Sequence, residues 1–246
     1  MPIPTAGAIR RCRTCRDDWS LNELDAMARK AARGAGYSWG LAEEAGRATR
    51  WLAAAGLPGP MCLARLLAEV DGADFKDFTP AVSAGRCAAD SGALCPLLTG
   101  VALCDGALDY SPMQGLTLSN LSAPLLLLPF VAQTFGIQAS GTQSSGVPTS
   151  ERVRLRWAEV QIILEHGAVY LDGVVGDLTC AQAESVTLDP APAEKSPKGV
   201  LLAPQSRAVI DVATRTCLEG FAQRTFAPAT EASRLAGAGA GLSDND

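Results

Sequence analysis

The residue best placed for nucleophilic chemistry is Cys95, because Pro96 follows it directly. Proline favours the first position of a helix, so the pair predicts a helix that begins at Pro96 with Cys95 as its N-cap. There the helix dipole and the free backbone amides lower the pKa of a thiol, which would activate Cys95 as a catalytic nucleophile without a histidine. The flanking residues are mostly leucine and valine, however, and they favour a cysteine buried in the core. In that case serine should be a more disruptive replacement than alanine, because a buried hydroxyl needs a partner.

A second candidate site lies where the chain passes from one predicted helix to the next, around Gly36 and Gly40. Ser38 is the expected N-cap of the second helix, and the backbone amides at a helix N-terminus form a generic anion-binding site. Arg33 precedes this junction and Trp39 follows it, so the candidate ligand-binding residues here are Arg33, Ser38 and Trp39. The glycine spacing does not match the G-x-G-x-x-G fingerprint, and the glycines themselves are better interpreted as helix ends.

Charged side chains supply the remaining candidates. Glu43 and Glu44 fall in the first turns of the second helix, where they could act as acid/base catalysts or simply complement the helix dipole. Arg234, near the end of the chain, is a candidate for binding an anionic substrate. These residues do not form a complete catalytic constellation, so the sequence leaves it uncertain whether the protein is an enzyme.

The sequence does not indicate metal or cofactor chemistry. The chain has one histidine, His166, which excludes an HExxH motif or a cage of several histidines within one chain. Cys12 and Cys15 form a C-x-x-C pair, but no second pair at zinc-site spacing accompanies it, and it lies in an arginine-rich segment. We therefore expect no metal and no cofactor, and we interpret His166–Gly167 as a hairpin turn.

Three amphipathic helices must position the first candidates. Ser20 and Glu23 have the spacing of a capping box, which predicts a helix from about residue 21 to 33. A second helix is expected after Ser38, with the apolar stripe Leu41, Ala45, Ala48 and Leu52, and a third over about 63–70. These helices predict a helical unit over residues 20–72, preceded by a flexible leader over residues 1–19.

The periodicity changes farther along the chain. Residues 93–105 fit either a short helix or a buried strand, whereas apolar and charged residues alternate over 153–157, the pattern of a half-buried strand. Further short strands are expected near 161–164, 169–171, 186–188 and 200–202. A last helix is expected over 207–223, with Ile210, Ala213, Cys217 and Phe221 on one face. We predict an α+β fold: a helical N-terminal unit and a C-terminal helix around a mainly antiparallel β meander, with an α+β body over 73–236 and a flexible tail over 237–246.

Composition limits the classes of partner. Lys+Arg 21 against Asp+Glu 26 gives a net charge of -5, which argues against nucleic acid, whose binding needs clustered cations. The apolar run from Leu125 to Ala132 is shorter than the roughly 20 residues of a spanning helix, so we expect no membrane partner. The N-terminal residues do not resemble an export signal, and with eight cysteines we therefore expect reduced thiols and a cytoplasmic location.

Several stretches carry a resemblance to a known family: SLNELDAMARKAARGAGYSWGLAEEAGRATRWL over 20–52, LCPLLTGVALCD over 94–105, LLLLPF over 125–130, and RTFAPATEASRLAGAGAGLSDND over 224–246. With these motifs the chain resembles an uncharacterised bacterial family, mostly proteobacterial, of unknown function. The resemblance implies a cytosolic bacterial protein of small-molecule metabolism, and it supplies no activity.

Two functions remain open. The first is an enzyme or enzyme subunit acting on a small anionic metabolite, with Cys95, Glu43 and Glu44 as catalytic candidates. The second is a non-catalytic binding or assembly protein that partners another metabolic subunit. The partner is then a small-molecule ligand or a protein subunit, and a homo-oligomer is possible. A pocket that gathers the candidate groups would favour the enzyme, and a flat apolar patch would favour the assembly protein.

Overall fold

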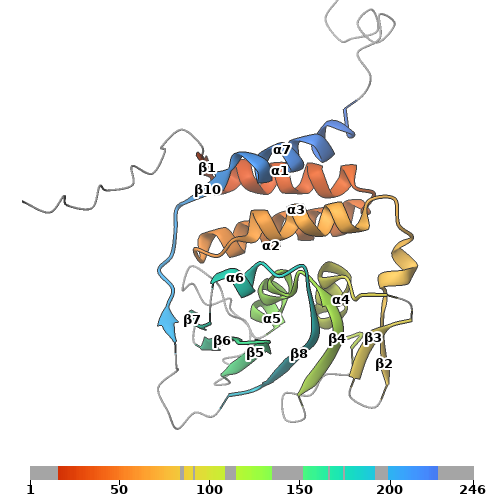
Figure 1. Cartoon of the computed structure of the whole chain (residues 1–246), viewed down its shortest axis with the longest axis vertical. Coiled ribbons are helices and arrows are strands. Elements are labelled where there is room, and N and C mark those ends of the chain that lie inside the picture. The colour runs from red at the N-terminus through yellow and green to blue at the C-terminus, as the bar shows by residue number, and fades with distance from the viewer. Residues whose placement is uncertain are drawn as a thin grey trace, which may run out of the picture.

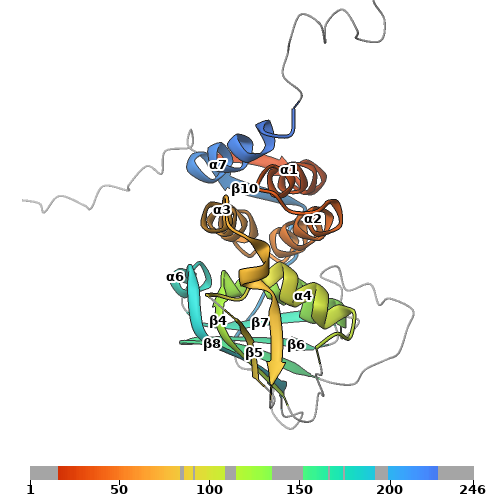
Figure 2. The same cartoon turned by 90° about the vertical axis from the view of Figure 1, so that its right-hand side faces the viewer.

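The protein is described by a computed structural model, which covers residues 16–83, 86–90, 92–108, 115–134, 152–165, 167–173, 175–191 and 199–226. Layers of helices are stacked over one face of a curved sheet (Figure 1). Seen edge-on in Figure 2, the helices form an outer pair and an inner pair, and shorter helices lie between the inner pair and the strands. This architecture confirms the predicted α+β fold class.

The N-terminal helices form as the sequence predicts. They are α1 (Leu21–Gly34), α2 (Trp39–Ala54) and α3 (Gly59–Val70). Ser20 and Glu23 form the expected capping box, and the Ser38 hydroxyl accepts a hydrogen bond from the Leu41 amide at the start of α2. The faces that the helices bury are rich in alanine and leucine, which lets the helices pack closely.

The predicted helix over 207–223 is wrong in its first part. Residues Arg207–Asp211 form strand β10, and helix α7 spans only Val212–Gln223. Asp211 ends the strand and caps the helix, because its carboxylate accepts a hydrogen bond from the Thr214 amide. The predicted helix face is correct for Phe221, which is buried, and for Cys217, which packs against the core, but Ala213 is exposed. The residues that α7 buries are Thr214, Leu218, Phe221 and Ala222.

Strand β10 pairs antiparallel with β1, which spans Arg16–Ser20 and therefore includes residues 16–19 of the expected leader. The two strands form a separate two-stranded sheet beside α1 and α7. Residues 1–15, with Cys12 and Cys15, lie outside the described residues, as do the tail over 237–246 and Arg234.

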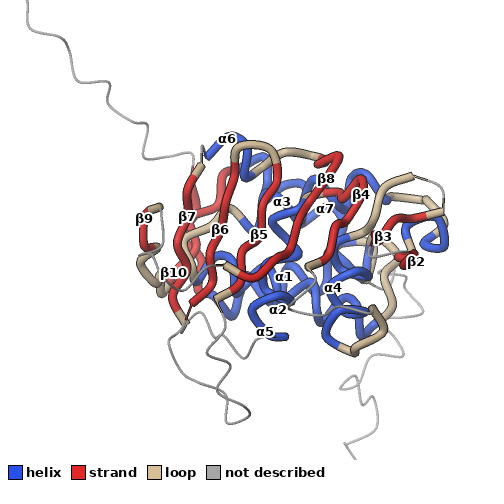
Figure 3. The backbone as a smooth tube through the Cα atoms, turned by 90° about the horizontal axis from the view of Figure 1, so that it is seen from below, coloured by secondary structure: helices blue, strands red, loops and turns tan. Residues whose placement is uncertain are grey.

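The larger sheet has eight strands in the order β2-β3-β4-β8-β5-β6-β7-β9, and every neighbouring pair is antiparallel except β3 and β4. The predicted hairpin is confirmed by the pairing of β6 with β7, although His166 itself lies outside the described residues. Figure 3 shows the strands in front of the helices, seen from the face of the sheet opposite to them. The strands are β2 (Pro80–Ser83), β3 (Arg86–Ala89), β4 (Leu116–Ser122), β5 (Val153–Trp157), β6 (Val160–Glu165), β7 (Ala168–Asp172), β8 (Gln182–Pro190) and β9 (Val200–Leu201).

Short helices fill the space between the inner helix pair and the sheet. They are α4 (Pro96–Cys104), α5 (Leu128–Thr134) and α6 (Val175–Leu178), together with the 3-10 turns η2 (Phe75–Phe78) and η3 (Pro124–Leu127). The ambiguous stretch 93–105 is therefore mainly a helix. The apolar run Leu125–Leu128 is completely buried, as its composition predicts.

One continuous apolar core runs from α1 through α2 and α3 to the inner face of the eight-stranded sheet. A smaller cluster formed by Leu24, Ala53, Ala208 and Ile210 attaches the β1–β10 pair to the helices. Among the described residues, no helix combines the length and apolar character needed to cross a bilayer. The domain boundaries drawn from the sequence stay predictions.

Candidate functional site

Cys95 occupies the predicted place in the fold, but its side chain is inaccessible. It is the N-cap residue of α4 with Pro96 in the first turn, and its exposed fraction is 0 %. Its thiol and the buried hydroxyl of Tyr37 are hydrogen-bonded at 3.3 Å. Burial raises the pKa of the thiol, although the hydrogen bond with Tyr37 opposes that shift. The surroundings are those of a core cysteine.

The charged and aromatic side chains around Ser38 interact with neighbouring groups of the protein itself. The Arg33 guanidinium donates a hydrogen bond of 2.7 Å to the Tyr37 carbonyl and lies 5.0 Å from the centre of the Trp39 ring. Ser38 caps α2 with its hydroxyl. Trp39 is 65 % exposed and forms no pocket wall with the other predicted residues. The three residues are neighbours, but the pocket described below contains none of them.

The predicted acid/base residues lie on the outer surface of α2. Both Glu43 and Glu44 form ion pairs with Arg47 one turn farther along the helix. These are i,i+4 and i,i+3 pairs on the helix surface, and the first turn of α2 contains no acidic residue, so the expected place of the two glutamates at the start of the helix is not observed. The structure thus does not bring Glu43 or Glu44 together with the buried thiol of Cys95 in one accessible cavity.

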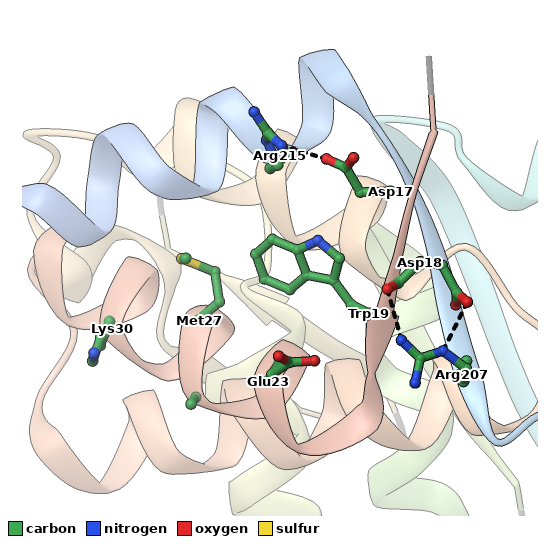
Figure 4. Close-up of a pocket in the computed structure, with 9 residues that line it drawn as sticks. Asp17, Asp18, Trp19, Glu23, Met27, Lys30, Arg207 and Arg215 are labelled. Carbon is green, nitrogen blue, oxygen red and sulfur yellow. Dashed lines mark hydrogen bonds and ion pairs between the residues drawn. The ribbon is translucent and has the colours of Figure 1, made fainter. Parts of the chain in front are cut away.

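A different group of residues lines an open pocket of about 600 Å³ between β1, α1, α7 and the start of β10 (Figure 4). Its size falls within the usual range for small-molecule sites. Trp19 lies in the middle of the pocket, with Met27 beside it on α1. The lining residues are Asp17, Asp18, Trp19, Glu23, Ala26, Met27, Lys30, Arg207 and Arg215.

The local folding of two elements explains the arrangement. Glu23, Met27 and Lys30 stand at positions i, i+4 and i+7 of α1, so they share one face of the helix. Asp17 and Trp19 share one face of β1, because side chains alternate along a strand. The antiparallel register places Ser20 opposite Arg207 and so brings two segments that are distant in the sequence together at the pocket.

Ion pairs hold the pocket walls in place. Asp17 binds Arg215 of α7 at 2.5 Å, and Asp18 binds Arg207 of β10 at 2.8 Å. The buried Nε of Arg215 lies 3.5 Å from Glu219 and has no hydrogen-bond partner in the described structure.

Two charges of the pocket have no ion-pair partner among the described residues. Lys30 is exposed and forms no ion pair with a described carboxylate; its Nζ lies 5.7 Å from the centre of the Phe226 ring. The Ser20 amide donates a hydrogen bond of 2.8 Å to Oε2 of Glu23. Hydrogen bonds from the side chain and then the backbone of Ser20 hold the pKa of Glu23 below its ordinary value of 4.5. Glu23 is therefore charged at neutral pH.

Sequence reasoning missed all nine lining residues. The sequence places Asp17, Asp18 and Trp19 in a leader and Arg207 in a helix, whereas the structure has strands at both places. A usable signal was present on α1, where Glu23, Met27 and Lys30 repeat at helical spacing on a face separate from the alanine-rich buried one. None of the lining residues is a cysteine, histidine, serine or threonine, and no group of acids, histidines or cysteines in the described residues could hold a metal ion.

The fold and the site together define an α+β protein with a small-molecule-sized pocket in its helical part. In a comparison with known families, a family described as "Protein of unknown function (DUF3726)" matches residues 19–93. This match confirms, over that segment, the resemblance to a family of unknown function. Neither the curated proteins nor the solved structures contain a significant match to the chain.

Proposed function

We propose that this protein is a non-catalytic binding protein of bacterial small-molecule metabolism, and that it holds a small anionic ligand in the pocket between β1, α1 and α7. The observation that carries the proposal is the combination of an apolar wall, Trp19 and Met27, with a cation, Lys30, that has no ion pair with a described carboxylate. Ligand pockets typically combine apolar walls with a few placed charges. An anionic group at Lys30 would complete this arrangement.

The chemistry of the lining favours binding over catalysis. An effective general base has a pKa near the working pH, whereas the pKa of Glu23 is lowered. Asp17 and Asp18 are each engaged by an arginine, and the lining offers no thiol, hydroxyl or imidazole as a nucleophile. The enzyme alternative depends on Cys95, Glu43 and Glu44. Cys95 is buried, and the two glutamates form ion pairs with Arg47 outside the pocket.

The proposal includes a cytoplasmic location. All six cysteines of the described residues are free thiols, which supports a reducing compartment. A partner subunit remains part of the proposal, since the exposed Trp39 with its stacked Arg33 belongs to the residue types enriched at the centres of protein interfaces.

Thermal unfolding in the presence of small acids tests the proposal. A ligand that binds only the folded state raises Tm, by about 2–4 °C for each kcal/mol in a chain of this size. We expect millimolar hexanoate or succinate to raise Tm, 1-hexanol to have a smaller effect, and each acid to be recovered unchanged. Lys30→Gln should abolish the difference between acid and alcohol, whereas Arg50→Gln, an exposed charge on α2 outside the pocket, should not. No increase in Tm with any acid, or the same increase in Lys30→Gln, would contradict the proposal.

A further inference from the structure

We infer that the ligand of this pocket is a dipolar molecule, with an anionic group and a cationic group at opposite ends of a short apolar body. The inference rests on the proposed function and narrows its ligand class. The juxtaposition that carries it is Glu23, Met27 and Lys30 on one face of α1, opposite Trp19.

The lining of the pocket contains as many acidic as basic side chains. Three acids and three bases face the pocket, and two pairs of them neutralise each other: Asp17 with Arg215 and Asp18 with Arg207. The remaining charges are one base, Lys30, and one acid, Glu23. A purely anionic ligand would satisfy the first and be repelled by the second.

Glu23 and Lys30 are well separated along helix α1. Seven residues separate Glu23 from Lys30, which at 1.5 Å per residue is a rise of about 10 Å. Flexible side chains allow the charged groups to approach a shorter ligand. A molecule with its charges several ångströms apart can therefore face both residues at once, whereas a compact zwitterion would reach only one.

The surface of the pocket between Glu23 and Lys30 is largely apolar. Met27 lies one turn from Glu23 and just under one turn from Lys30, and the Trp19 ring fills the middle of the pocket. Methylene groups of a ligand would lie against these two side chains. Because Asp17 and Asp18 are neutralised by their arginines, the acid that would face the cationic group of the ligand is Glu23, and Lys30 would face the anionic group.

Calorimetric titration with three matched probes tests the inference: 6-aminohexanoate, which carries both charges, hexanoate, which carries only the anion, and hexylamine, which carries only the cation. Because an exposed ion pair is worth less than about 1 kcal/mol, we expect 6-aminohexanoate to bind about two- to fivefold more tightly than either singly charged probe. Glu23→Gln is the decisive variant, since glutamine also completes a capping box and the start of α1 should be kept. Lys30→Gln is its counterpart, and Glu43→Gln, on the surface of α2, is the matched control.

The variants should change the preference in a defined way. Glu23→Gln should reduce 6-aminohexanoate to the affinity of hexanoate, Lys30→Gln should reduce it to the affinity of hexylamine, and Glu43→Gln should change nothing. The inference would be overturned if hexanoate and 6-aminohexanoate bound equally well, and if Lys30→Gln weakened the binding of both while Glu23→Gln weakened neither. That result would leave the proposed function supported. Absence of binding by all three probes would overturn both.

Discussion

At the scale of single residues, the groups that look chemically active in the sequence mostly stabilise the protein's own fold. The Arg33 guanidinium binds a carbonyl and stacks on Trp39, and Glu44 binds Arg47 on the same helix. The Cys95 thiol and the Tyr37 hydroxyl are hydrogen-bonded to each other inside the core. A residue type at a helix terminus therefore indicates local chemistry only when its side chain also reaches an accessible cavity.

The Cys95–Tyr37 hydrogen bond leads to a prediction about stability. Cys95→Ala should lower the free energy of unfolding by about 1–3 kcal/mol, because it leaves the buried Tyr37 hydroxyl without a partner. Cys95→Ser should cost less, since serine can still bond that hydroxyl. This order is the reverse of the one expected from the sequence, which contained no sign of Tyr37 as a partner. Urea unfolding of both variants checks it, and a smaller loss for alanine than for serine would contradict it.

Burial also predicts the reactivity of this thiol. In the native protein Cys95 should be alkylated by iodoacetamide more slowly than the half-buried Cys104, Cys180 and Cys217, because no reagent reaches it before unfolding. Mass spectrometry of peptides after timed labelling measures the order. Rapid labelling of Cys95 in the folded protein would instead restore it as a catalytic candidate.

Asp211 provides a prediction about pH. Hydrogen bonds, first from the Thr214 side chain, hold the pKa of Asp211 below its ordinary value of 3.8. A lowered pKa in the folded state stabilises the protein above the unfolded pKa, and this contribution is lost as the pH falls below about 4. Asparagine is an equally good N-cap without the charge. The stability advantage of wild type over Asp211→Asn should therefore shrink between pH 6 and pH 3 in urea titrations; a constant difference would show that the charge contributes nothing.

At the scale of elements, the pairing of β1 with β10 could not be predicted from the sequence. Each strand has only five residues, and local patterns over so short a length do not identify a partner that lies about 190 residues away. Long elements with strong periodicity were predictable: the capping box of α1, the stripes of α2 and α3, and the β6–β7 hairpin. The pocket was not, because two of its walls come from the elements that were misassigned.

Matched truncations test the role of β1. A chain beginning at residue 16 keeps the strand, whereas one beginning at residue 20 loses Trp19 and the ion pairs of Asp17 and Asp18. We expect the shorter chain to have a Tm several degrees lower, since about 1–2 kcal/mol of packing and pairing is removed. Equal Tm values for the two chains, measured by calorimetry, would mean that β1 does not contribute to the folded state.

Two glycines test the packing of α1 against α7. A Cβ on Gly34 would lie 1.8 Å from the Phe221 carbonyl oxygen, so Gly34→Ala must push α7 away and should cost more than 1 kcal/mol. Gly220, on the exposed side of α7, has no atom near its Cβ position, and Gly220→Ala should stabilise the helix by up to about 1 kcal/mol. Thermal unfolding separates the two, and a stabilised Gly34→Ala variant would contradict this packing.

At the scale of the whole molecule, a single core joins the helices to the eight-stranded sheet. The elements that line the pocket, α1, α7 and the β1–β10 pair, lie on the side of the helical layers away from that sheet (Figure 1). The sheet therefore supports the inner helices, and these support the α1–α7 pair, which carries five of the nine residues that line the pocket. Fold class could be predicted from periodicity along the chain. The site could not, because it depends on contacts between segments that are distant in the sequence.

Ligand binding in the pocket is tested most directly with the four tryptophans, of which Trp19 alone lines the pocket. Their indole N–H signals can be recorded by NMR in protein labelled with ¹⁵N and assigned by replacing each tryptophan with phenylalanine. On titration with 6-aminohexanoate or hexanoate, we expect a saturable shift of the Trp19 signal, while the signals of Trp39, Trp51 and Trp157 stay in place. A saturable shift of Trp39 instead, or no shift of Trp19 at probe concentrations that raise Tm, would contradict binding in this pocket.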